Sequence, residues 1–185
     1  RGVQGVSFTV SSPAGDMVMR LALPGIHNVA NALAAVAVGL SCDVPLTDIR
    51  DGLESLRPVA GRLCATQSPA GTVIVDDCYN ANPGSVRAAI DMLAACSGRR
   101  TLVLGAMREL GENSGELHRE IGEYALAGGI DQLWGVGPEV EVSVRAFGAG
   151  GRYFGDREAL ISELPGQFGN GDTVLVKGSR SAGME

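Results

Sequence analysis

The sequence is poor in aromatic residues and carries no excess of positive charge. Aromatic residues make up 4% of the 185 residues, whereas glycine occurs 27 times, which indicates tight turns and a core of small and aliphatic side chains. The formal net charge is −6. Because a nucleic-acid-binding protein needs a basic face, this charge argues against a nucleic-acid partner. Any anionic ligand must then be bound by a few placed cations and by backbone N–H groups.

The cysteines and the apolar runs bear on the compartment. The four cysteines are widely spaced, contain no C-x-x-C pair, and predict neither a zinc site nor a disulfide framework. Free thiols are typical of a reducing cytoplasm. The longest apolar run, residues 29–40, is shorter than the roughly 20 residues that a membrane span needs. The first residues also lack the pattern of a signal peptide. We therefore expect a cytoplasmic protein without membrane insertion.

The first third of the chain predicts the end of a larger domain. Residues 5–10 and 17–23 predict two strands joined by a turn. A lone hairpin is marginal in water, so we expect the rest of its sheet to lie upstream and the chain to be a fragment. Residues 27–40 predict a helix that is apolar nearly all round and hence buried, and residues 46–56 predict a second helix. The Pro- and Gly-containing segment 57–61 predicts a linker and a domain boundary.

Strands and helices alternate through the remainder, residues 61–185. Apolar runs typical of buried strands lie at 72–77, 101–105, 132–136, 152–155 and 172–179, and helices are predicted between them at 84–96, 114–127, 138–147 and 156–164. Strands that are apolar throughout and separated by helices indicate a parallel sheet covered on both faces. The sequence therefore predicts an α/β protein whose second domain is Rossmann-like.

Polar residues gather where the strand at 72–77 ends. Asp76 and Asp77 are followed by Asn80 and Asn82, and Pro83 suits the first position of a helix. Ligands of open parallel sheets bind at the carboxyl ends of the strands, so this pattern predicts a ligand site. Alternatively, Asp77 or Asn82 caps the helix and the other polar groups are solvated turn residues.

Lys177 is the only lysine among 15 basic residues. It lies at the end of the last predicted strand and is followed by Gly178, Ser179 and Arg180. Such a segment can offer N–H groups, a hydroxyl and a guanidinium to a phosphate or carboxylate. A general arginine bias with one chance exception would also explain the single lysine. We favour a site that needs a compact point charge.

Four further residues have both a binding and a structural interpretation. His27, Asn28 and Asn31 share a face at the start of the first helix, where the asparagines could bind an adenine edge, or where Asn28 or His27 could cap the helix. Arg62 follows the linker and could contact a phosphate, or it is an ordinary surface residue. His118 stands among charged residues on an amphipathic helix, which predicts a solvated position.

Several motifs are absent. The sequence has no G-x-x-x-x-G-K-[ST] loop and no G-x-G-x-x-G after a strand, so it predicts neither a complete triphosphate cradle nor a nicotinamide site. No His/Glu constellation suits a catalytic metal, so no metal ligand is predicted in this chain.

Five strings, in order, resemble the Mur ligase family of peptidoglycan synthesis. They are GIHNVANALAAVAVGL, LRPVAGRL, VDDCYNANPGSVRAAI, LGAMRELGENSGELHREIG and VLVKGSRSAGME. The resemblance covers nearly all of residues 20–185. It implies that residues 1–60 are the end of the family's central α/β ATP-binding domain and that residues 61–185 are its C-terminal ligase domain. Cys78 stands where relatives commonly have serine, and Ala106 replaces an acidic residue often found there.

The resemblance also implies the ligands. ATP would be bound with Mg²⁺, whose ligands are expected outside this chain. The reaction would add D-alanyl-D-alanine to UDP-N-acetylmuramoyl-tripeptide through an acyl phosphate. The remaining partners would be the upstream domains of the same protein, the protein would be a monomer, and the isolated chain would be inactive.

Residue roles follow from the resemblance by position. His27, Asn28 and Asn31 would lie near the ATP, with the asparagines at the adenine. Arg62 would approach the phosphates and Asp77 the ribose.

The other site residues would serve the substrates. Tyr79, Asn80 and Asn82 would line the cleft. Lys177 would lie near the dipeptide or the reacting phosphate, together with Ser179 and Arg180. Lys177 and Arg62 would be the catalytic residues.

Two other functions stay open at this point. One is a non-catalytic Rossmann-like module that binds a nucleotide or small anion. The other is a ligase of the folylpolyglutamate type, although that relative carries a different string where YNANP stands here.

Overall fold

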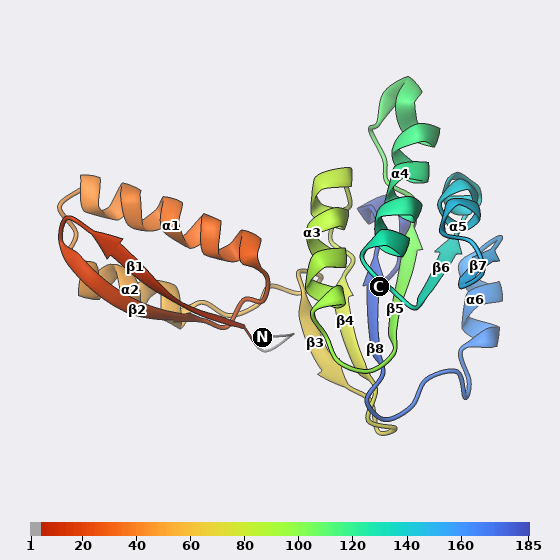
Figure 1. Cartoon of the computed structure of the whole chain (residues 1–185), viewed down its shortest axis with the longest axis horizontal. Helices are drawn as coiled ribbons and strands as arrows, with labels where there is room; N and C mark the ends of the chain where they lie inside the picture. Colours follow the sequence, from red (N-terminus) through yellow and green to blue (C-terminus); the bar gives the residue numbers. More distant parts are fainter. Residues whose placement is uncertain (1–4) are drawn as a thin grey trace. The chain divides into compact units, whose positions relative to one another are not determined.

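The computed structural model describes residues 5–185, which form two compact units (Figure 1). One unit ends at Pro58 and the other is Val59–Glu185. None of the helices in the described residues is long and apolar enough to cross a bilayer.

The first unit is a hairpin packed on two helices. Strands β1 (Val6–Ser12) and β2 (Gly15–Leu21) pair antiparallel, and helices α1 (Ile26–Ser41) and α2 (Leu46–Ser55) follow. Both predicted strands and both predicted helices are therefore present. The core of this unit joins residues from all four elements, namely Val10, Met19, Val36, Leu46 and Ile49.

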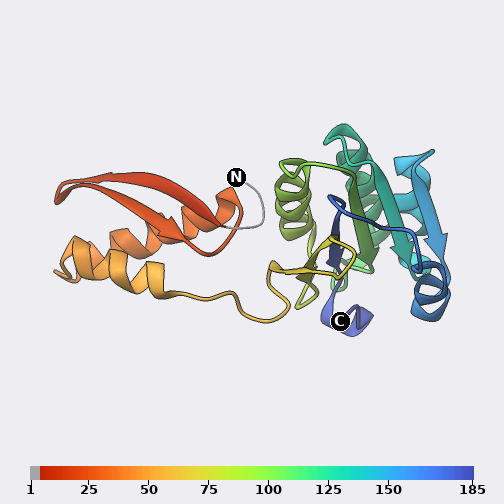
Figure 2. The ribbon, with the colours of Figure 1, turned by 90° about the horizontal axis from the view of Figure 1, so that it is seen from below.

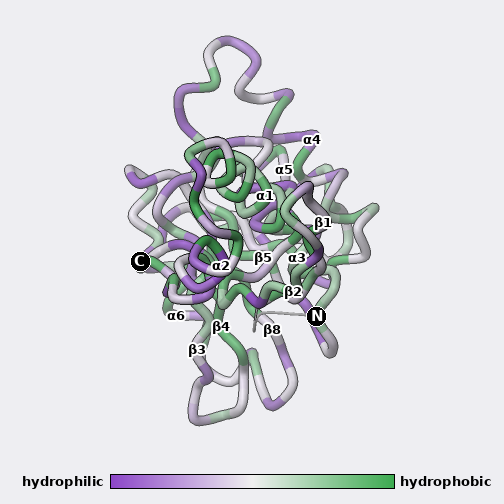
Figure 3. Tube along the Cα trace, turned by 90° about the vertical axis from the view of Figure 1, so that its left-hand side faces the viewer, coloured by the Kyte–Doolittle hydropathy of each residue, from purple (hydrophilic) through white to green (hydrophobic). Residues whose placement is uncertain are grey.

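Helix α1 is not buried all round, so that prediction is wrong for this structure. The helix is mostly hydrophobic, as the colouring in Figure 3 shows. Only Ala32 and Val36 are fully buried, whereas the exposed fractions of Ile26 and Val38 are 75% and 65%. The physical reason is that the hairpin and α2 contact one stripe of the helix and leave its other side open.

The second unit is built on a six-stranded sheet in the order β3-β4-β8-β5-β6-β7. The strands are β3 (Cys64–Gln67), β4 (Val73–Asp77), β5 (Arg100–Gly105), β6 (Gln132–Val136), β7 (Gly151–Phe154) and β8 (Thr173–Lys177). All pairs are parallel except β3–β4. The predicted α/β fold with a mostly parallel sheet is confirmed. Strand β3 was missed because its sequence, CATQ, has no apolar run.

The helices cover the two faces unequally (Figures 1 and 2). Helices α3 (Pro83–Ala94), α4 (Ser114–Ala127) and α5 (Glu141–Phe147) pack in a row against one face. Helix α6 (Arg157–Glu163) lies on the other face, where Leu160 packs against Val103, Trp134 and Val174. Alternate residues of each strand thus face the two layers.

The sheet order determines which loops meet. Strand β8, the last in the chain, lies between β4 and β5. In the parallel pair β4–β8, Asp77 is directly opposite Lys177. The loops that follow these strands therefore lie side by side at the carboxyl edge of the sheet.

Candidate functional site

Asp77 and Lys177 form a buried ion pair at this edge. Lys177 Nζ donates to Asp77 Oδ2 over 2.5 Å and to the Asn80 carbonyl oxygen over 3.0 Å. The exposed fractions of the two side chains are 2% for Lys177 and 13% for Asp77. A charge in such a position must be neutralised and hydrogen-bonded to be tolerated. We call Asp77 and Lys177 the buried pair.

The turn after β4 is held by its own hydrogen bonds. Asp76 Oδ1 accepts from the Cys78 N–H, and Asn80 Oδ1 accepts from the Ala81 N–H. Asn82 caps α3, because its side chain accepts from the Ser85 N–H over 2.9 Å while the Ser85 hydroxyl accepts from the Asn82 N–H. The capping interpretation therefore holds for Asn82, and Asp77 is occupied with Lys177 instead.

Two arginines lie over the ring of Tyr79. The guanidinium carbon of Arg62 is 4.1 Å from the ring centroid, and that of Arg180 is 5.7 Å away. Tyr79 is 42% exposed and both arginines are exposed. Cation–π contacts extend to about 6 Å, so both guanidiniums are within range. We call Arg62, Tyr79 and Arg180 the arginine–tyrosine stack.

The segment that leads into the second unit is hydrogen-bonded to the end of β4 and to the turn that follows it. The Tyr79 N–H donates to the Gly61 carbonyl oxygen over 2.9 Å, and the Leu63 N–H donates to Asp77 Oδ1 over 3.2 Å. Gly61 has φ +72°, and a Cβ there would lie 3.0 Å from the Tyr79 nitrogen. Leu63 has φ +51°, which is unusual for a branched residue. Strained backbone of this kind persists only where the surroundings fix it.

The loop after β8 is tied to the loop after β5. The Ser179 N–H donates to the Ala106 carbonyl oxygen over 2.9 Å, and Ser179 is 3% exposed. A Cβ at Gly178 would lie 3.3 Å from the Gly105 Cα and 2.8 Å from the Met184 side chain. Glycine at this strand end therefore allows the two loops to approach closely, and Arg180 starts from a fixed position.

His118 is fully buried, so the predicted solvated position is wrong. Its Nε2 accepts from the Met107 N–H over 3.1 Å, which leaves Nδ1 to donate to the Ser114 carbonyl oxygen over 2.8 Å. Ile121, Gly122 and Ala125 are buried on the same helix. The spacing 118, 121, 122 and 125 is the buried stripe of an amphipathic helix, and this signal could have placed the histidine.

Cys78 lies in the core next to the buried pair. Its Sγ donates to the Val176 carbonyl oxygen over 3.4 Å. Burial, followed by the neighbouring Asp76 carboxylate, raises the pKa of the Cys78 thiol to about 12. The thiol is therefore protonated at neutral pH and acts as a small packing residue.

His27, Asn28 and Asn31 belong to the first unit. Asn28 Nδ2 donates to the Pro24 carbonyl oxygen over 2.7 Å, and Asn31 Nδ2 donates to Asn28 Oδ1 over 3.3 Å. The cap position of α1 is Gly25, with no side-chain cap. The capping interpretation of His27 or Asn28 is thus not realised.

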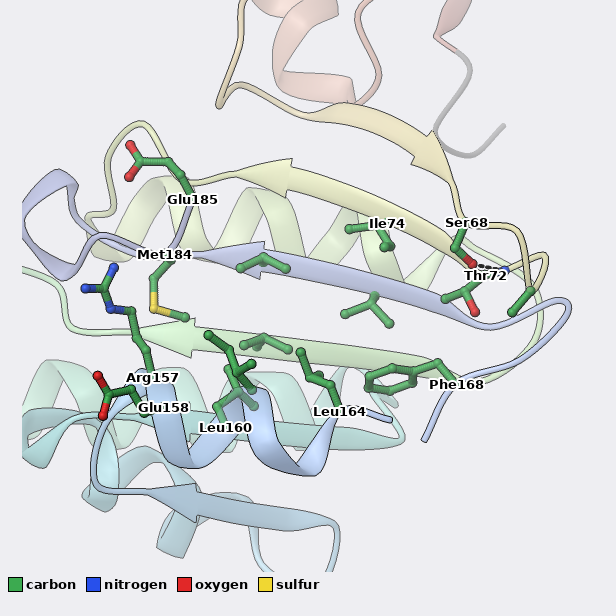
Figure 4. Close-up of a pocket in the computed structure, with 15 residues that line it drawn as sticks. Ser68, Thr72, Ile74, Arg157, Glu158, Leu160, Leu164, Phe168, Met184 and Glu185 are labelled. Atoms are coloured by element: carbon green, nitrogen blue, oxygen red, sulfur yellow. Dashed lines mark hydrogen bonds between the residues drawn. The ribbon is translucent and has the colours of Figure 1, made fainter. Parts of the chain in front are cut away.

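The eight predicted site residues of the second unit lie in or beside the turn after β4 and the loop after β8. A cavity of about 590 Å³ lies elsewhere, between α6 and the sheet, and is lined mostly by apolar side chains such as Ile74, Leu164 and Phe168 (Figure 4). No predicted site residue lines it. Within the described residues, no group of three or more His, Cys, Asp or Glu side chains could hold a metal ion.

The sequence and the fold together assign the chain to a family of ligases. Residues 61–180 match the family model described as "Mur ligase, glutamate ligase domain", and the chain belongs to the Mur ligase family.

Named relatives make this likeness more specific. The chain is 44% identical to the UDP-N-acetylmuramoyl-tripeptide–D-alanyl-D-alanine ligase of Escherichia coli (strain K12), over 98% of this chain and 40% of the relative. It is 34% identical to MurF of Acinetobacter baumannii, with a TM-score of 0.89 over 99% of this chain and 41% of that one. MurF of Thermotoga maritima, solved with ADP, gives 27% identity and a TM-score of 0.80, over 97% of this chain and 41% of that one. The chain thus spans about 40% of the length of these relatives.

Proposed function

We propose that this chain is part of an ATP-dependent ligase that joins D-alanyl-D-alanine to UDP-N-acetylmuramoyl-tripeptide in the cytoplasm during peptidoglycan synthesis. The observation that carries the proposal is the 44% identity to the E. coli ligase over 98% of the chain. In this scheme residues 1–60 end the central ATP-binding domain, and residues 61–185 are the C-terminal ligase domain. Several relatives carry the same name, UDP-N-acetylmuramoyl-tripeptide–D-alanyl-D-alanine ligase, which also favours this reaction over that of a folylpolyglutamate-type ligase.

The proposed reaction activates a carboxylate and then forms an amide. The peptide carboxylate accepts the terminal phosphate of ATP, giving an acyl phosphate and ADP. The dipeptide amine attacks the acyl carbon, and phosphate leaves as the amide forms. Charge accumulates on oxygen in both steps, so fixed cations and N–H donors near these oxygens lower the barrier. Holding the amine against the acyl carbon lowers it further.

The buried pair suits a role at the nucleotide. In our proposal Asp77 binds the ribose hydroxyls, with Lys177 fixing the orientation of its carboxylate. The ammonium of Lys177 would also lie near the reacting phosphate or the dipeptide. His27, Asn28 and Asn31 would bind ATP, with the asparagines at the adenine.

The other predicted site residues of the second unit suit the anionic parts of the substrates. Arg62 would contact the ATP phosphates, and Ser179 and Arg180 would lie near the dipeptide or the reacting phosphate. Tyr79, Asn80 and Asn82 would line the same cleft. Mg²⁺ would neutralise phosphate charge, and we propose ligands for it outside this chain. The remaining domains of the same polypeptide would complete the site, and the enzyme would act as a monomer.

A chimera tests the proposed function. The 185 residues of this chain replace the matching part of the E. coli ligase, and ADP release is measured with ATP and UDP-N-acetylmuramoyl-tripeptide. We expect ADP release that depends on D-alanyl-D-alanine. L-alanyl-L-alanine is the matched control and should give only background. Equal ADP release with and without D-alanyl-D-alanine would contradict the proposal.

A further inference from the structure

The arginine–tyrosine stack brings two like charges to one aromatic ring. The guanidinium carbons of Arg62 and Arg180 lie 4.1 and 5.7 Å from the centroid of Tyr79. Each cation is attracted to the ring, but the two cations repel each other. An anion that contacts both guanidiniums would remove this repulsion. The arrangement therefore favours a bound anion.

Hydrogen bonds of neighbouring residues hold the backbone at both arginines. Arg62 is flanked by Gly61 and Leu63, whose backbone groups are hydrogen-bonded to Tyr79 and Asp77. Arg180 follows Ser179, which is hydrogen-bonded to Ala106 on the neighbouring loop. Since the backbone of neither segment needs to be ordered on binding, little backbone conformational entropy is lost when a ligand binds.

Neither guanidinium is neutralised by its own unit. Among the ion pairs of residues 59–185, none within 4.0 Å involves Arg62 or Arg180. Lys177 differs, because its ammonium is bonded to Asp77. Arg62 and Arg180 are therefore cations at this edge of the second unit that have no carboxylate partner within 4.0 Å.

We propose that Tyr79 is a positioning residue that holds Arg62 and Arg180 together as a two-guanidinium subsite for a phosphate group. The planar donors of arginine match the geometry of phosphate oxygens, and two guanidiniums can contact several oxygens at once. The ring keeps the two side chains from spreading into solvent. The inference rests on the proposed function only in that ATP supplies the phosphate group in the enzyme.

Inorganic pyrophosphate tests the subsite without an adenine. The 185-residue chain is titrated with pyrophosphate in a calorimeter at low salt. We expect Arg62→Gln and Arg180→Gln each to weaken binding by about tenfold, as expected for a lost charge-assisted hydrogen bond. Tyr79→Leu should weaken pyrophosphate binding about two- to fivefold through loss of the cation–π contacts. Tyr79→Phe keeps the ring and should bind pyrophosphate as the unaltered chain does. Arg145→Gln, which alters an exposed side chain of α5, is the matched control and should bind as the unaltered chain does.

A combined variant separates positioning from direct stacking. In the Arg62→Gln/Arg180→Gln background, Tyr79→Leu should cause no further loss, because no cation remains for the ring to hold. If the ring instead stacks on a base, Tyr79→Leu would weaken adenosine binding and leave pyrophosphate binding unchanged. That result would overturn the proposal. Absence of pyrophosphate binding by the unaltered chain, or an equal loss in Arg145→Gln, would also overturn it.

The chimera keeps the two proposals apart. If it shows no release of ADP dependent on D-alanyl-D-alanine while the pyrophosphate titrations follow the expected order, the proposed function fails and the subsite stands. If the chimera is active and pyrophosphate binding is insensitive to Tyr79→Leu, Arg62→Gln and Arg180→Gln, the subsite fails and the proposed function stands.

Discussion

The buried pair and the arginine–tyrosine stack occupy the same edge of the sheet but hold their charges in opposite ways. Lys177 is 2% exposed and bonded to a carboxylate, whereas Tyr79 is 42% exposed and its two arginines face solvent. A buried charge requires a permanent partner, while an exposed one is stable without a partner. The buried pair is therefore set during folding, whereas the arginine–tyrosine stack is free to accept a ligand.

The choice of side chain follows this difference. Lys177 reaches Asp77 and the Asn80 carbonyl with one compact ammonium group. A planar guanidinium suits contact with an aromatic face, as in the stack. The single lysine of a sequence rich in arginine is therefore placed where a compact buried cation is required.

The largest expected effect comes from breaking the buried pair. Lys177→Met leaves the Asp77 carboxylate buried without its cation, and removal of one partner of a buried pair costs about 3–5 kcal/mol. We expect a loss of this size in the free energy of unfolding, measured by urea denaturation.

The double variant Asp77→Asn/Lys177→Met is the control for this prediction. It removes both charges, so it should recover much of the stability lost in Lys177→Met. An unfolding midpoint of Lys177→Met equal to that of the unaltered chain would show that the pair contributes nothing, and the contrast with the stack would disappear.

The alkylation rate of Cys78 measures how well the turn between the buried pair and the arginine–tyrosine stack is protected from solvent. At pH 8, alkylation of Cys78 should be much slower than that of exposed Cys42, because Cys78 is buried and burial raises the pKa of its thiol to about 12. Mass spectrometry of the labelled chain measures both rates. Equal alkylation rates of Cys78 and Cys42 in the folded chain would contradict the burial of Cys78.

The same shift predicts a pH dependence of stability. The unfolded chain loses the Cys78 proton near pH 9, whereas the folded chain keeps it until about pH 12. The stability contributed by this thiol is complete below pH 9 and falls as the pH rises through that range. Cys78→Ala should reduce this alkaline loss, and an unchanged loss would assign it to other groups.

His118 tests the support of the neighbouring loop. His118→Leu leaves the Met107 N–H and the Ser114 carbonyl without their side-chain partner, so we expect a loss of about 2 kcal/mol in the free energy of unfolding. Arg119→Gln, at the adjacent surface residue, should change it far less, because exposed ion pairs contribute little. Similar losses in both variants would contradict the buried role of His118.

The smallest effect is expected from the stack. Arg62→Gln should change the free energy of unfolding by no more than about 1 kcal/mol, since exposed cation–π contacts are weak. Thermal unfolding beside Lys177→Met measures the difference directly. A loss as large as that of Lys177→Met would show that Arg62 is a structural residue and would remove the distinction between the two groups.

The sequence predicted the fold where hydrophobic periodicity is strong. The parallel strands end at Asp77 and Lys177, and the sheet order brings these ends together as expected for a ligand edge. The prediction that Pro83 is the first residue of a helix is also confirmed, as is the alternative in which Asn82 caps that helix. These features depend on local patterns that a single sequence carries.

Other features depend on contacts that no local pattern shows. Strand β3 forms because the chain pairs with β4 after Leu63, although its own residues are polar or small. The exposure of α1 depends on how much of its surface the hairpin covers. The closure of Lys177 onto Asp77 depends on register between strands that are 100 residues apart in the chain. Such long-range pairings are properties of the assembled sheet.

The sheet also ends in a way that limits self-association. Both outermost strands, β3 and β7, are only four residues long, and β3 runs against the direction of its neighbour. Short edge strands give another molecule few free N–H and C=O groups with which to extend the sheet. Strand β3, the first element of the second unit, therefore also discourages fibril-like stacking of copies.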